Sequence, residues 1–387
     1  MTGAMYAAVA GLRAHMSAMN VIGNNISNVN TTGYKATRYT FSEALYTTVR
    51  NGSNGNRQVG GTNPAQVGYG ASVGTIDLDM STKNYTPTGR GLDCMIDGDG
   101  FFLLGNDKTN QGITEQSALS GMTLSRLGNL EFDANGYLVD GNGSLVYGFL
   151  RNTSTDEFIA ASGDPNLNPE DVQEEQMTQP ILTPIRYPMC YVHALGGEDG
   201  AENVATRMVT DILWPYADAN GQIVDRTAPA EGEVEEGAEI SRLQPNSVII
   251  DQTGQITAMT KDEKLIVIGL IAIGTVDNPN GVTHVDGRYY QALGGAGRVH
   301  VSTVGGGLQY DPSAQEEGGG GEENVTSNIM VESSGDTKII PGGLESSGTD
   351  LSDEITNLIL LQRGYQANTR IVTVTDTMLE ELINMKR

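Results

Sequence analysis

The chain ends in LSDEITNLILLQRGYQANTRIVTVTDTMLEELINMKR, residues 351–387, and the spacing of the apolar side chains in this stretch decides the fold. Apolar and aromatic residues recur there at intervals of three, four and seven, which is the pattern of a helix with one buried face. Asn368 and Thr375 occupy polar positions of the same ladder. Because such a helix gains little stability alone in water, it needs a partner surface. The residues of this ladder are Leu358, Leu361, Tyr365, Val372, Leu379 and Leu382.

A second ladder, with spacings of four and three, runs through the start of the chain. Its residues are Met5, Val9, Leu12, Met16, Met19 and Ile26. The same helix carries small residues that let neighbouring helices approach closely, namely Ala4, Ala7, Ala8, Ala10, Ala14 and Ala18. Pairing of the two ends predicts a coiled-coil domain formed by residues 1–30 and 350–387. Because the alanines suggest neighbours beyond a single partner, we expect both ladders to be self-assembly surfaces that contact other copies of the chain.

The segment after the first ladder is polar and rich in asparagine, with the sequence GNNISNVNTTGYKATRYTF at residues 23–41. Asparagine tolerates left-handed backbone and bonds to its own backbone, so the run predicts the end of the helix. Residues 51–70 are turn-forming and poor in apolar side chains. We therefore expect residues 31–70 to form an extended linker.

Beyond this linker the apolar period changes to two, beginning with SVGTIDLDM at residues 72–80. Asn-Gly pairs at 135 and 142 predict hairpin turns, and the apolar run at residues 265–274 predicts a buried strand. With 50 glycines the body should be mainly β.

The expected fold is a mainly β multi-domain body with paired N- and C-terminal helices. The nested order is helix, β, inserted β, β, helix. Residues 71–150 and 241–349 would form the β-domain, and 151–240, with acidic loops, an inserted outer β-domain.

Composition excludes several classes of function. With 23 Lys and Arg against 48 Asp and Glu, the net charge of −25 disfavours nucleic acid and anionic lipid as partners. No secretory signal is visible at the N-terminus, and the longest apolar run is too short to cross a bilayer, so we expect no membrane insertion. Cys94 and Cys190 lie far apart without a pairing motif, which predicts two free thiols.

Motifs for catalysis are weak. Residues 70–74 match G-x-S-x-G, but a glycine-rich connector precedes Ser72 and a strand follows it, the reverse of what a nucleophile elbow requires. The Asp- and Gly-rich runs near residues 96–102 and 133–143 lack the ligand spacing of a calcium loop. The histidines are isolated from one another. We expect no catalytic, cofactor or metal site, and no enzyme activity.

Two stretches carry a family resemblance: NVIGNNISNVNTTGYKATR at residues 20–38 and QRGYQAN at residues 362–368. They resemble the signatures of flagellar rod and hook proteins. The matching residues are Asn24, Asn25, Asn28, Asn30 and Gly33 in the first stretch, and Gln362, Arg363, Tyr365, Gln366 and Asn368 in the second. The resemblance covers about 1–150 and 245–387, whereas 151–240 matches nothing that we can name.

Further stretches are similar to the hook branch of the family: GTNPAQVGYG at residues 61–70, DNPNGVTHVDGRYY at 277–290 and GTDLSDE at 348–354. The length of the chain and its insert also favour a hook protein over the shorter rod proteins. The resemblance implies a subunit that assembles into a curved, flexible tube, a universal joint that transmits torque from rod to filament. The alternative is a distal rod protein, a rigid drive shaft. An unrelated reading, a surface hydrolase or adhesin using residues 151–240, also stays open.

The resemblance also implies partners and a location. The partners would be other copies of the chain, the distal rod protein, the hook cap protein, the hook-filament junction protein and the flagellar type III export apparatus. The subunit would be extracellular and exported without a cleaved signal peptide. FSEAL at residues 41–45 resembles the element that engages the export gate, with Phe41 and Leu45 as its apolar residues. An equally good interpretation is that Phe41 docks the linker onto the helix pair.

Overall fold

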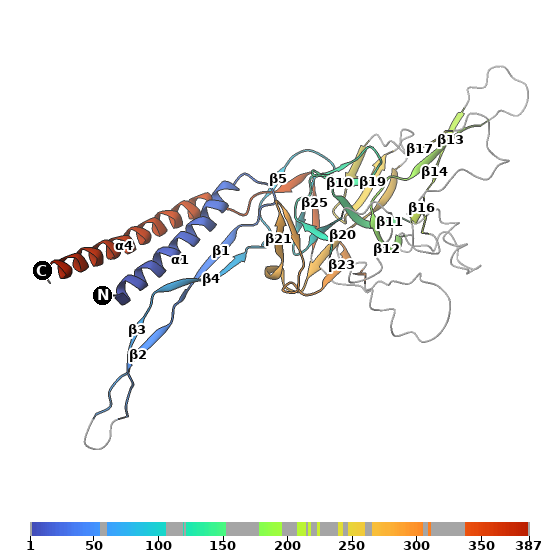
Figure 1. The fold of residues 1–387 in the computed structure, drawn as a ribbon. Helices are drawn as coiled ribbons and strands as arrows, with labels where there is room; N and C mark the ends of the chain where they lie inside the picture. The colour runs from blue at the N-terminus through green and yellow to red at the C-terminus, as the bar shows by residue number, and fades with distance from the viewer. Residues whose placement is uncertain are drawn as a thin grey trace, which may run out of the picture. The chain divides into compact units, whose positions relative to one another are not determined.

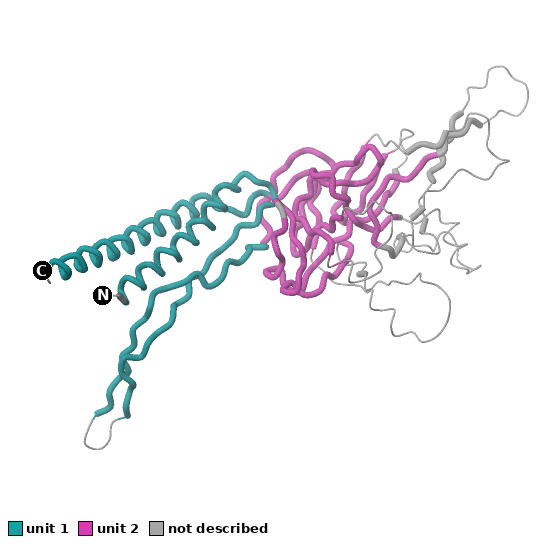
Figure 2. The backbone as a smooth tube through the Cα atoms, in the orientation of Figure 1, with its two compact units in different colours: residues 1–80, 346–387 teal, residues 81–345 magenta. Residues whose placement is uncertain are grey.

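The computed structural model describes residues 2–54, 60–105, 119, 121–151, 178–195, 207–213, 216–217, 223–224, 239–242, 247–259, 265–304, 309–310 and 337–385. The chain divides into two compact units (Figure 2). The first unit combines residues 1–80 with 346–387, and the second comprises residues 81–345. Both ends of the chain therefore belong to one unit.

The first unit is built from two long helices and a β-ribbon (Figure 1). Helix α1 spans Thr2–Ser27 and helix α4 spans Leu351–Asn384. The Asp350 side chain caps α4 by accepting hydrogen bonds from the backbone N–H groups of Ser352 (2.9 Å) and Asp353 (3.4 Å). Asp353 and Glu354 place negative charge in the first turn, where the helix dipole favours it.

The β-ribbon occupies much of the range expected to be an extended linker. Strand β1 (Thr37–Glu43) pairs antiparallel with β4 (Ala71–Leu78), and β2 (Tyr46–Arg50) pairs antiparallel with β3 (Ala65–Gly68). The composition of residues 31–70 correctly indicates turns but conceals these short strands, which are rich in Thr, Tyr and Val. Strand β4, which the sequence analysis assigns to the β-domain, lies in the first unit because it pairs with β1.

Gly70 allows the ribbon to lie close to α1. Its φ of 106° is in the left-handed region, and a Cβ there would lie 2.9 Å from the carbonyl oxygen of Ala7. A glycine is therefore required at this position both by the backbone conformation and by the contact with the helix.

The second unit is mainly β, as expected, and is organised around a 13-stranded sheet. Within it, strands neighbour one another in the order β18, β19, β20, β11, β7, β8, β22, β21. The longest strand, β20 (Leu265–Val276), is the apolar run predicted to be buried. The other strands of the sheet are β7 (Phe101–Gly105), β8 (Thr123–Ser125), β9 (Leu130–Phe132), β10 (Leu138–Asp140), β11 (Leu145–Arg151), β12 (Thr178–Pro184), β18 (Ser247–Ile250), β19 (Gln255–Met259), β21 (Thr283–Asp286), β22 (Tyr289–Gln291), β23 (Val299–Thr303) and β24 (Gln309–Tyr310).

Smaller strand pairs complete this unit. β5 (Tyr85–Pro87) pairs with β26 (Gly343–Glu345), and β6 (Cys94–Asp97) pairs with β25 (Lys338–Pro341). A short 3-10 helix, η2, spans Pro279–Gly281. These pairings join segments far apart in the sequence, on either side of residues 151–240.

The hairpin turns at the Asn-Gly pairs are confirmed. The Asp133 carboxylate accepts hydrogen bonds from the N–H groups of Asn135 and Tyr137, both at 2.8 Å, and Gly136 has φ 80°. The Asp140 carboxylate makes the equivalent bonds to Asn142 and Ser144. Side-chain capping of the turn and the glycine's positive φ explain both hairpins without a bound ion.

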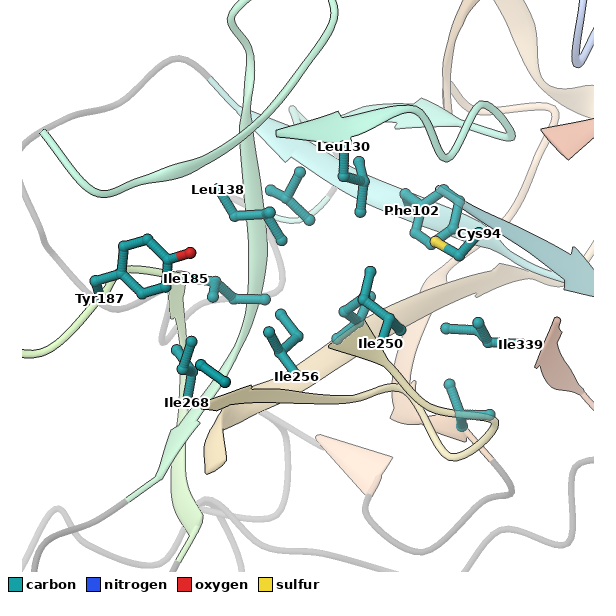
Figure 3. Close-up of a cluster of buried hydrophobic side chains, with 14 of the residues drawn as sticks. Cys94, Phe102, Leu130, Leu138, Ile185, Tyr187, Ile250, Ile256, Ile268 and Ile339 are labelled. Atoms are coloured by element: carbon teal, nitrogen blue, oxygen red, sulfur yellow. The ribbon is translucent and has the colours of Figure 1, made fainter. Parts of the chain in front are cut away.

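The core of the second unit consists of side chains from the large sheet and the strands that cover it (Figure 3). Phe132 and Tyr187 stack with ring centroids 3.8 Å apart, and Ile185 is fully buried. Other members include Cys94, Phe102, Leu130, Leu138, Ile250, Ile256, Ile268 and Ile339. Cys94 and Cys190 are both buried free thiols, as predicted, and burial raises the pKa of the Cys94 thiol.

The range 151–240 contains strands that extend the second unit. β12 pairs with β11 of the large sheet. β13 (Met189–Leu195) lies between β14 (Arg207–Leu213) and β17 (Glu239–Arg242) in a three-stranded sheet, and β15 (Tyr216–Ala217) pairs with β16 (Ile223–Val224). Much of the acidic sequence around these strands lies outside the described residues.

Gly128 offers a test of this packing. A Cβ at this position would overlap the carbonyl oxygen of Cys94, whereas one at Gly294 would meet nothing within 4 Å. We expect Gly128→Ala to destabilise the second unit by about 1–3 kcal/mol or more, because backbone must move to relieve the overlap. Gly294→Ala is the matched control and should change stability by less than about 0.5 kcal/mol. Urea unfolding of both variants measures the difference, and equal midpoints would contradict the packing described.

Candidate functional site

The terminal helix pair, α1 with α4, is the candidate functional site because it contains the predicted assembly residues. The helices lie side by side and antiparallel (Figure 1). Near one end, the Asn25 amide donates a 2.7 Å hydrogen bond to Oε1 of Glu354. Further along, Gly364 faces His15 and Gly11 faces Asn368. Residues nearer the start of α1 therefore lie opposite residues nearer the end of α4, as expected for antiparallel helices.

Two glycines set how closely the helices approach. A Cβ at Gly11 would lie 2.6 Å from Nδ2 of Asn368, and a Cβ at Gly364 would lie 2.7 Å from Cε1 of His15. Each glycine thus leaves space for a larger polar side chain from the opposite helix. Close approach of the two backbones follows from this exchange of small and large residues.

An apolar cluster fills the pair between these polar contacts. Ala18, Ile22 and Leu361 are buried at its centre, and partly buried apolar side chains surround them. The surrounding residues are Met19, Ile26, Tyr39 and Leu358. Since Tyr39 comes from β1, the ribbon also contributes to burial of the helix pair.

On α1, the face that packs against α4 lies one residue earlier than the predicted ladder. It runs through Gly11, His15, Ala18, Ile22 and Asn25. Of the predicted residues, Met5 and Met16 are exposed, with 39% and 52% of their surface accessible. Val9, Leu12, Met19 and Ile26 are half-buried. The contact with α4 favours Gly and Ala over bulky side chains because the helices approach closely, so the methionines lie beside the seam.

On α4, the predicted ladder corresponds better to the observed packing. Leu361 is buried, and Leu358, Val372 and Leu379 are half-buried. Tyr365 and Leu382 are exposed instead. Two polar positions of the ladder point inward as expected, since Thr375 is buried and Asn368 fits opposite Gly11.

Asn25 is the centre of a buried polar network at the base of the pair. Its amide nitrogen donates to the Thr37 carbonyl (2.8 Å) and to Glu354. Its carbonyl oxygen accepts from the Tyr34 hydroxyl at 3.0 Å and from both the N–H and the hydroxyl of Thr37 at 3.1 Å. One side chain therefore connects α1, β1 and α4. Burial, followed by the charge of Glu354, raises the pKa of Tyr34.

The other residues of the first signature hold the chain as it leaves α1. Asn24 lies within the helix and donates to the Tyr34 hydroxyl (3.1 Å), while the Asn28 amide donates to the Asn24 carbonyl (2.9 Å). Asn30 is exposed, and Gly33 has φ 70°. The asparagines were expected to form the turn itself, but Asn24 and Asn25 are helical, and the positive φ belongs to Gly33.

The second signature lies in the middle of α4. Gln362, Arg363 and Gln366 are exposed, and the seam position is occupied by Gly364 together with Asn368. Sequence reasoning missed the roles of His15, Ile22 and Gly364. The signal that could have found them on α1 is a second series of positions, each one residue before the predicted ladder. This series combines small and polar residues with the apolar Ile22.

Many large apolar side chains of the first unit remain exposed within a single chain. We call those on the two helices the outer apolar residues: Met5, Tyr6, Met16, Leu351, Ile355, Ile359, Leu360, Tyr365, Ile371, Val374, Met378, Leu382 and Ile383. The ribbon adds Leu45, Tyr46, Val49, Val67, Tyr69 and Ile76. A concentration of exposed apolar surface of this kind indicates an interaction site.

The two apolar residues of the predicted export element differ in their surroundings. Phe41 packs edge-on against His15 (5.6 Å between ring centroids) and Tyr39 (5.4 Å). Leu45 is 84% exposed. Phe41 therefore also docks the ribbon onto the helix pair, whereas Leu45 makes little contact within the chain.

Across the described ranges, no three or more His, Cys, Asp and Glu side chains gather as a metal ion would require. None of the helices in the described part of the chain is both long and apolar enough to cross a membrane.

Leu361 and its neighbour Leu360 provide a matched test of the helix seam, because Leu361 is 5% exposed and Leu360 is 64% exposed. We expect Leu361→Ala to lower the free energy of unfolding of the helix pair by about 2–5 kcal/mol, the usual cost of a cavity at a buried leucine. Leu360→Ala should change it by less than about 0.5 kcal/mol in the monomer. Circular dichroism at increasing urea concentration measures both. Equal losses would mean that the two helices do not pack through Leu361.

Comparison with known proteins gives two family matches, one at each end of the chain. Residues 5–35 match the family described as flagella basal body rod protein. Residues 340–385 match the C-terminal family of the flagellar basal body rod FlgEFG proteins. The matched segments contain most of α1 and all of α4, so they coincide with the terminal helix pair.

Relatives of known identity align over the whole chain. The flagellar basal-body rod protein FlgG of Bacillus subtilis is 28% identical over 387 residues, which cover all of both chains. The flagellar hook protein FlgE of Borreliella burgdorferi is 22% identical, again with full coverage of both. A crystal structure of Helicobacter pylori flagellar hook protein FlgE2 matches 67% of this chain and 100% of that one, with 10% identity and a TM-score of 0.33. The two terminal matches and the full-length relatives together support a protein of the flagellar hook and rod type.

Proposed function

We propose that this chain is the structural subunit of a flagellar hook, a homopolymeric tube that joins the rod to the filament and transmits torque between them. The single observation that carries the proposal is the set of outer apolar residues on the terminal helices. A single copy of the chain leaves these side chains in water. Contact with further copies would bury them and so favour assembly.

In this proposal the terminal helices associate as coiled coils in the inner part of the tube, and the nested β segments lie outside them. The ladders on α1 and α4 repeat at three and four residues, which suits helix packing between copies. The range 151–240 would contribute to outer contacts. Its acidic composition suits contacts that form and separate as the tube bends.

The proposed role is structural and not enzymatic. The partners would be other copies of the chain, the distal rod, the hook cap, the hook-filament junction and the type III export apparatus. The subunit would act outside the cell after export without a cleaved signal peptide. The terminal family matches and the full-length relatives support these assignments at the level of a flagellar structure.

A distal rod subunit is the second candidate, and it rests on a specific observation. The Bacillus subtilis relative named as a rod protein aligns with the whole of this chain, so chain length does not separate the two roles. Several relatives named as hook proteins, including full-length matches in Borreliella burgdorferi and Treponema pallidum, favour the hook. Electron microscopy of polymers of the purified chain distinguishes them: curved, bendable tubes are expected for a hook and straight, stiff tubes for a rod.

Charge placed among the outer apolar residues tests self-assembly. Met16, Ile371 and Met378 are 52%, 45% and 50% exposed, so an aspartate at each should leave the monomer within about 0.5 kcal/mol of its original stability. In a tube the same charge would be buried in every repeated interface, at a cost of about 3–5 kcal/mol per subunit. We expect Met16→Asp, Ile371→Asp and Met378→Asp each to prevent polymerisation, as followed by sedimentation.

The control for these variants is Asn357→Asp, which adds the same charge to exposed α4 surface without removing an apolar side chain. It should polymerise. If all three apolar variants polymerise as readily as the control, the helices do not form the interface between copies.

Secretion tests the export role of residues 41–45. We expect Phe41→Ala and Leu45→Ala each to reduce the amount of subunit secreted by a flagellated cell several-fold, while the purified variants still polymerise. Tyr46→Ala is the control, because Tyr46 is a neighbouring aromatic that is 53% exposed. Normal secretion of Leu45→Ala would refute the export role. A defect of Phe41→Ala alone, with a weakened helix pair, would assign Phe41 to docking the ribbon against His15 and Tyr39.

A further inference from the structure

The contacts between α1 and α4 follow a constant register. Asn25 bonds to Glu354, His15 lies against Gly364, and Gly11 lies against Asn368. His15 lies ten residues before Asn25 on α1, and Gly364 lies ten residues after Glu354 on α4. The two contacts therefore belong to the same alignment of the helices. We call these six the register residues. Each pair contains at least one polar side chain at the seam between the helices.

The apolar residues alone do not fix this register. The α4 ladder repeats about every seven residues, and the facing side of α1 is rich in alanine and glycine. Sliding one helix past the other by seven residues would again place apolar side chains of α4 against small residues of α1. Sequence pattern and apolar burial therefore leave more than one register available.

The register residues distinguish these alternatives. A slide of seven residues in one direction places the Asn25 amide opposite Leu361, where its hydrogen bond to Glu354 is lost. A slide in the other direction places Glu354 opposite Ala18, a fully buried position without a donor side chain. A buried polar group without its partner is costly, so both slides are disfavoured.

Asn25 is also bound on its other side. Two hydrogen bonds from Thr37 and one from Tyr34 reach its carbonyl oxygen, and its amide donates to the Thr37 carbonyl. Near the same point, the Ser347 hydroxyl donates to the Asn28 carbonyl (2.9 Å) and the Gly348 N–H donates to the Tyr34 carbonyl (2.8 Å). Asn25 is thus held at a fixed place relative to β1, and Glu354 reaches it in only one alignment of α4.

We infer that Asn25 and Glu354, supported by the His15–Gly364 and Gly11–Asn368 contacts, are positioning residues that specify the antiparallel register of the terminal helices. Register determines which side chains of α4 face α1 and which remain among the outer apolar residues. Because register determines which apolar side chains stay exposed, the inference bears on the proposed assembly. The register itself is a property of one chain and does not depend on the proposed function.

Disulfide trapping in the full chain measures the register directly. Ala4→Cys with Thr375→Cys forms the in-register pair, and Ala4→Cys with Leu382→Cys forms a pair displaced by seven residues. Cys94 and Cys190 are buried in the second unit, so they do not compete. Mild oxidation of the monomer, read as a mobility shift on a denaturing gel, should trap the in-register pair at least tenfold faster than the displaced pair.

Asn25→Asp removes the amide that donates to Glu354 and should reduce this ratio at least threefold. Adding Glu354→Gln should restore at least half of the lost preference for the in-register crosslink. The amide introduced on α4 can then donate to the carboxylate introduced on α1. Asn24→Asp is the matched control, since Asn24 is the adjacent exposed asparagine and makes no bond to α4 among those described. The control should keep the original ratio.

The inference is overturned if Asn25→Asp keeps the tenfold preference, if Glu354→Gln fails to restore it, or if Asn24→Asp lowers it equally. Should Asn25→Asp abolish both crosslinks, Glu354→Leu replaces it as the test. This variant keeps Asn25 and its bonds to β1 but removes the acceptor on α4. A threefold loss of preference supports the inference, and an unchanged ratio contradicts it. Failure of the chain to polymerise would affect the proposed function and not this result.

Discussion

The close approach of α1 and α4 is the constraint on which the rest of the first unit depends. Gly11 and Gly364 each leave space for a polar side chain of the opposite helix, and Ala18 allows Leu361 to be buried between them. Small residues suit this contact because they lose little conformational entropy and permit backbone proximity. They also bury little apolar area. The helix pair is therefore narrow, and it cannot cover the larger apolar side chains that both helices carry.

This incomplete burial connects the fold to the proposed function. Methionine, isoleucine and valine side chains on the helices and the ribbon remain largely exposed in one copy. A two-stranded ribbon is itself marginally stable in water. Both features would be stabilised by the same event, the packing of further copies around the helices. The second unit has its own buried core and does not need such contacts to fold.

Sequence reasoning predicted the β body, the Asn-Gly hairpins and the buried strand at 265–274, because each has a strong local signal. The face of α1 that packs against α4 lies one residue before the predicted assembly ladder. Met5, Met16 and Leu12 give the stronger apolar periodicity, but the seam is chosen by fit against α4, which favours Gly11, Ala18 and Ile22. The network around Asn25 could not be predicted, since it joins residues of α1, β1 and α4 that only the folded chain brings together. Strands β1 to β3 were missed because their pairing, more than their composition, defines them.

Methionine oxidation tests the central claim most directly, that the exposed helix surface of one copy is the interface between copies. Met5, Met16 and Met378 are 39%, 52% and 50% exposed, and oxidation by dilute peroxide follows exposure. Mass spectrometry can compare the oxidation rate of each residue in the monomer and in the assembled polymer. The account predicts that all three react readily in the monomer and at least tenfold more slowly in the polymer. Equal rates in the two states would contradict it.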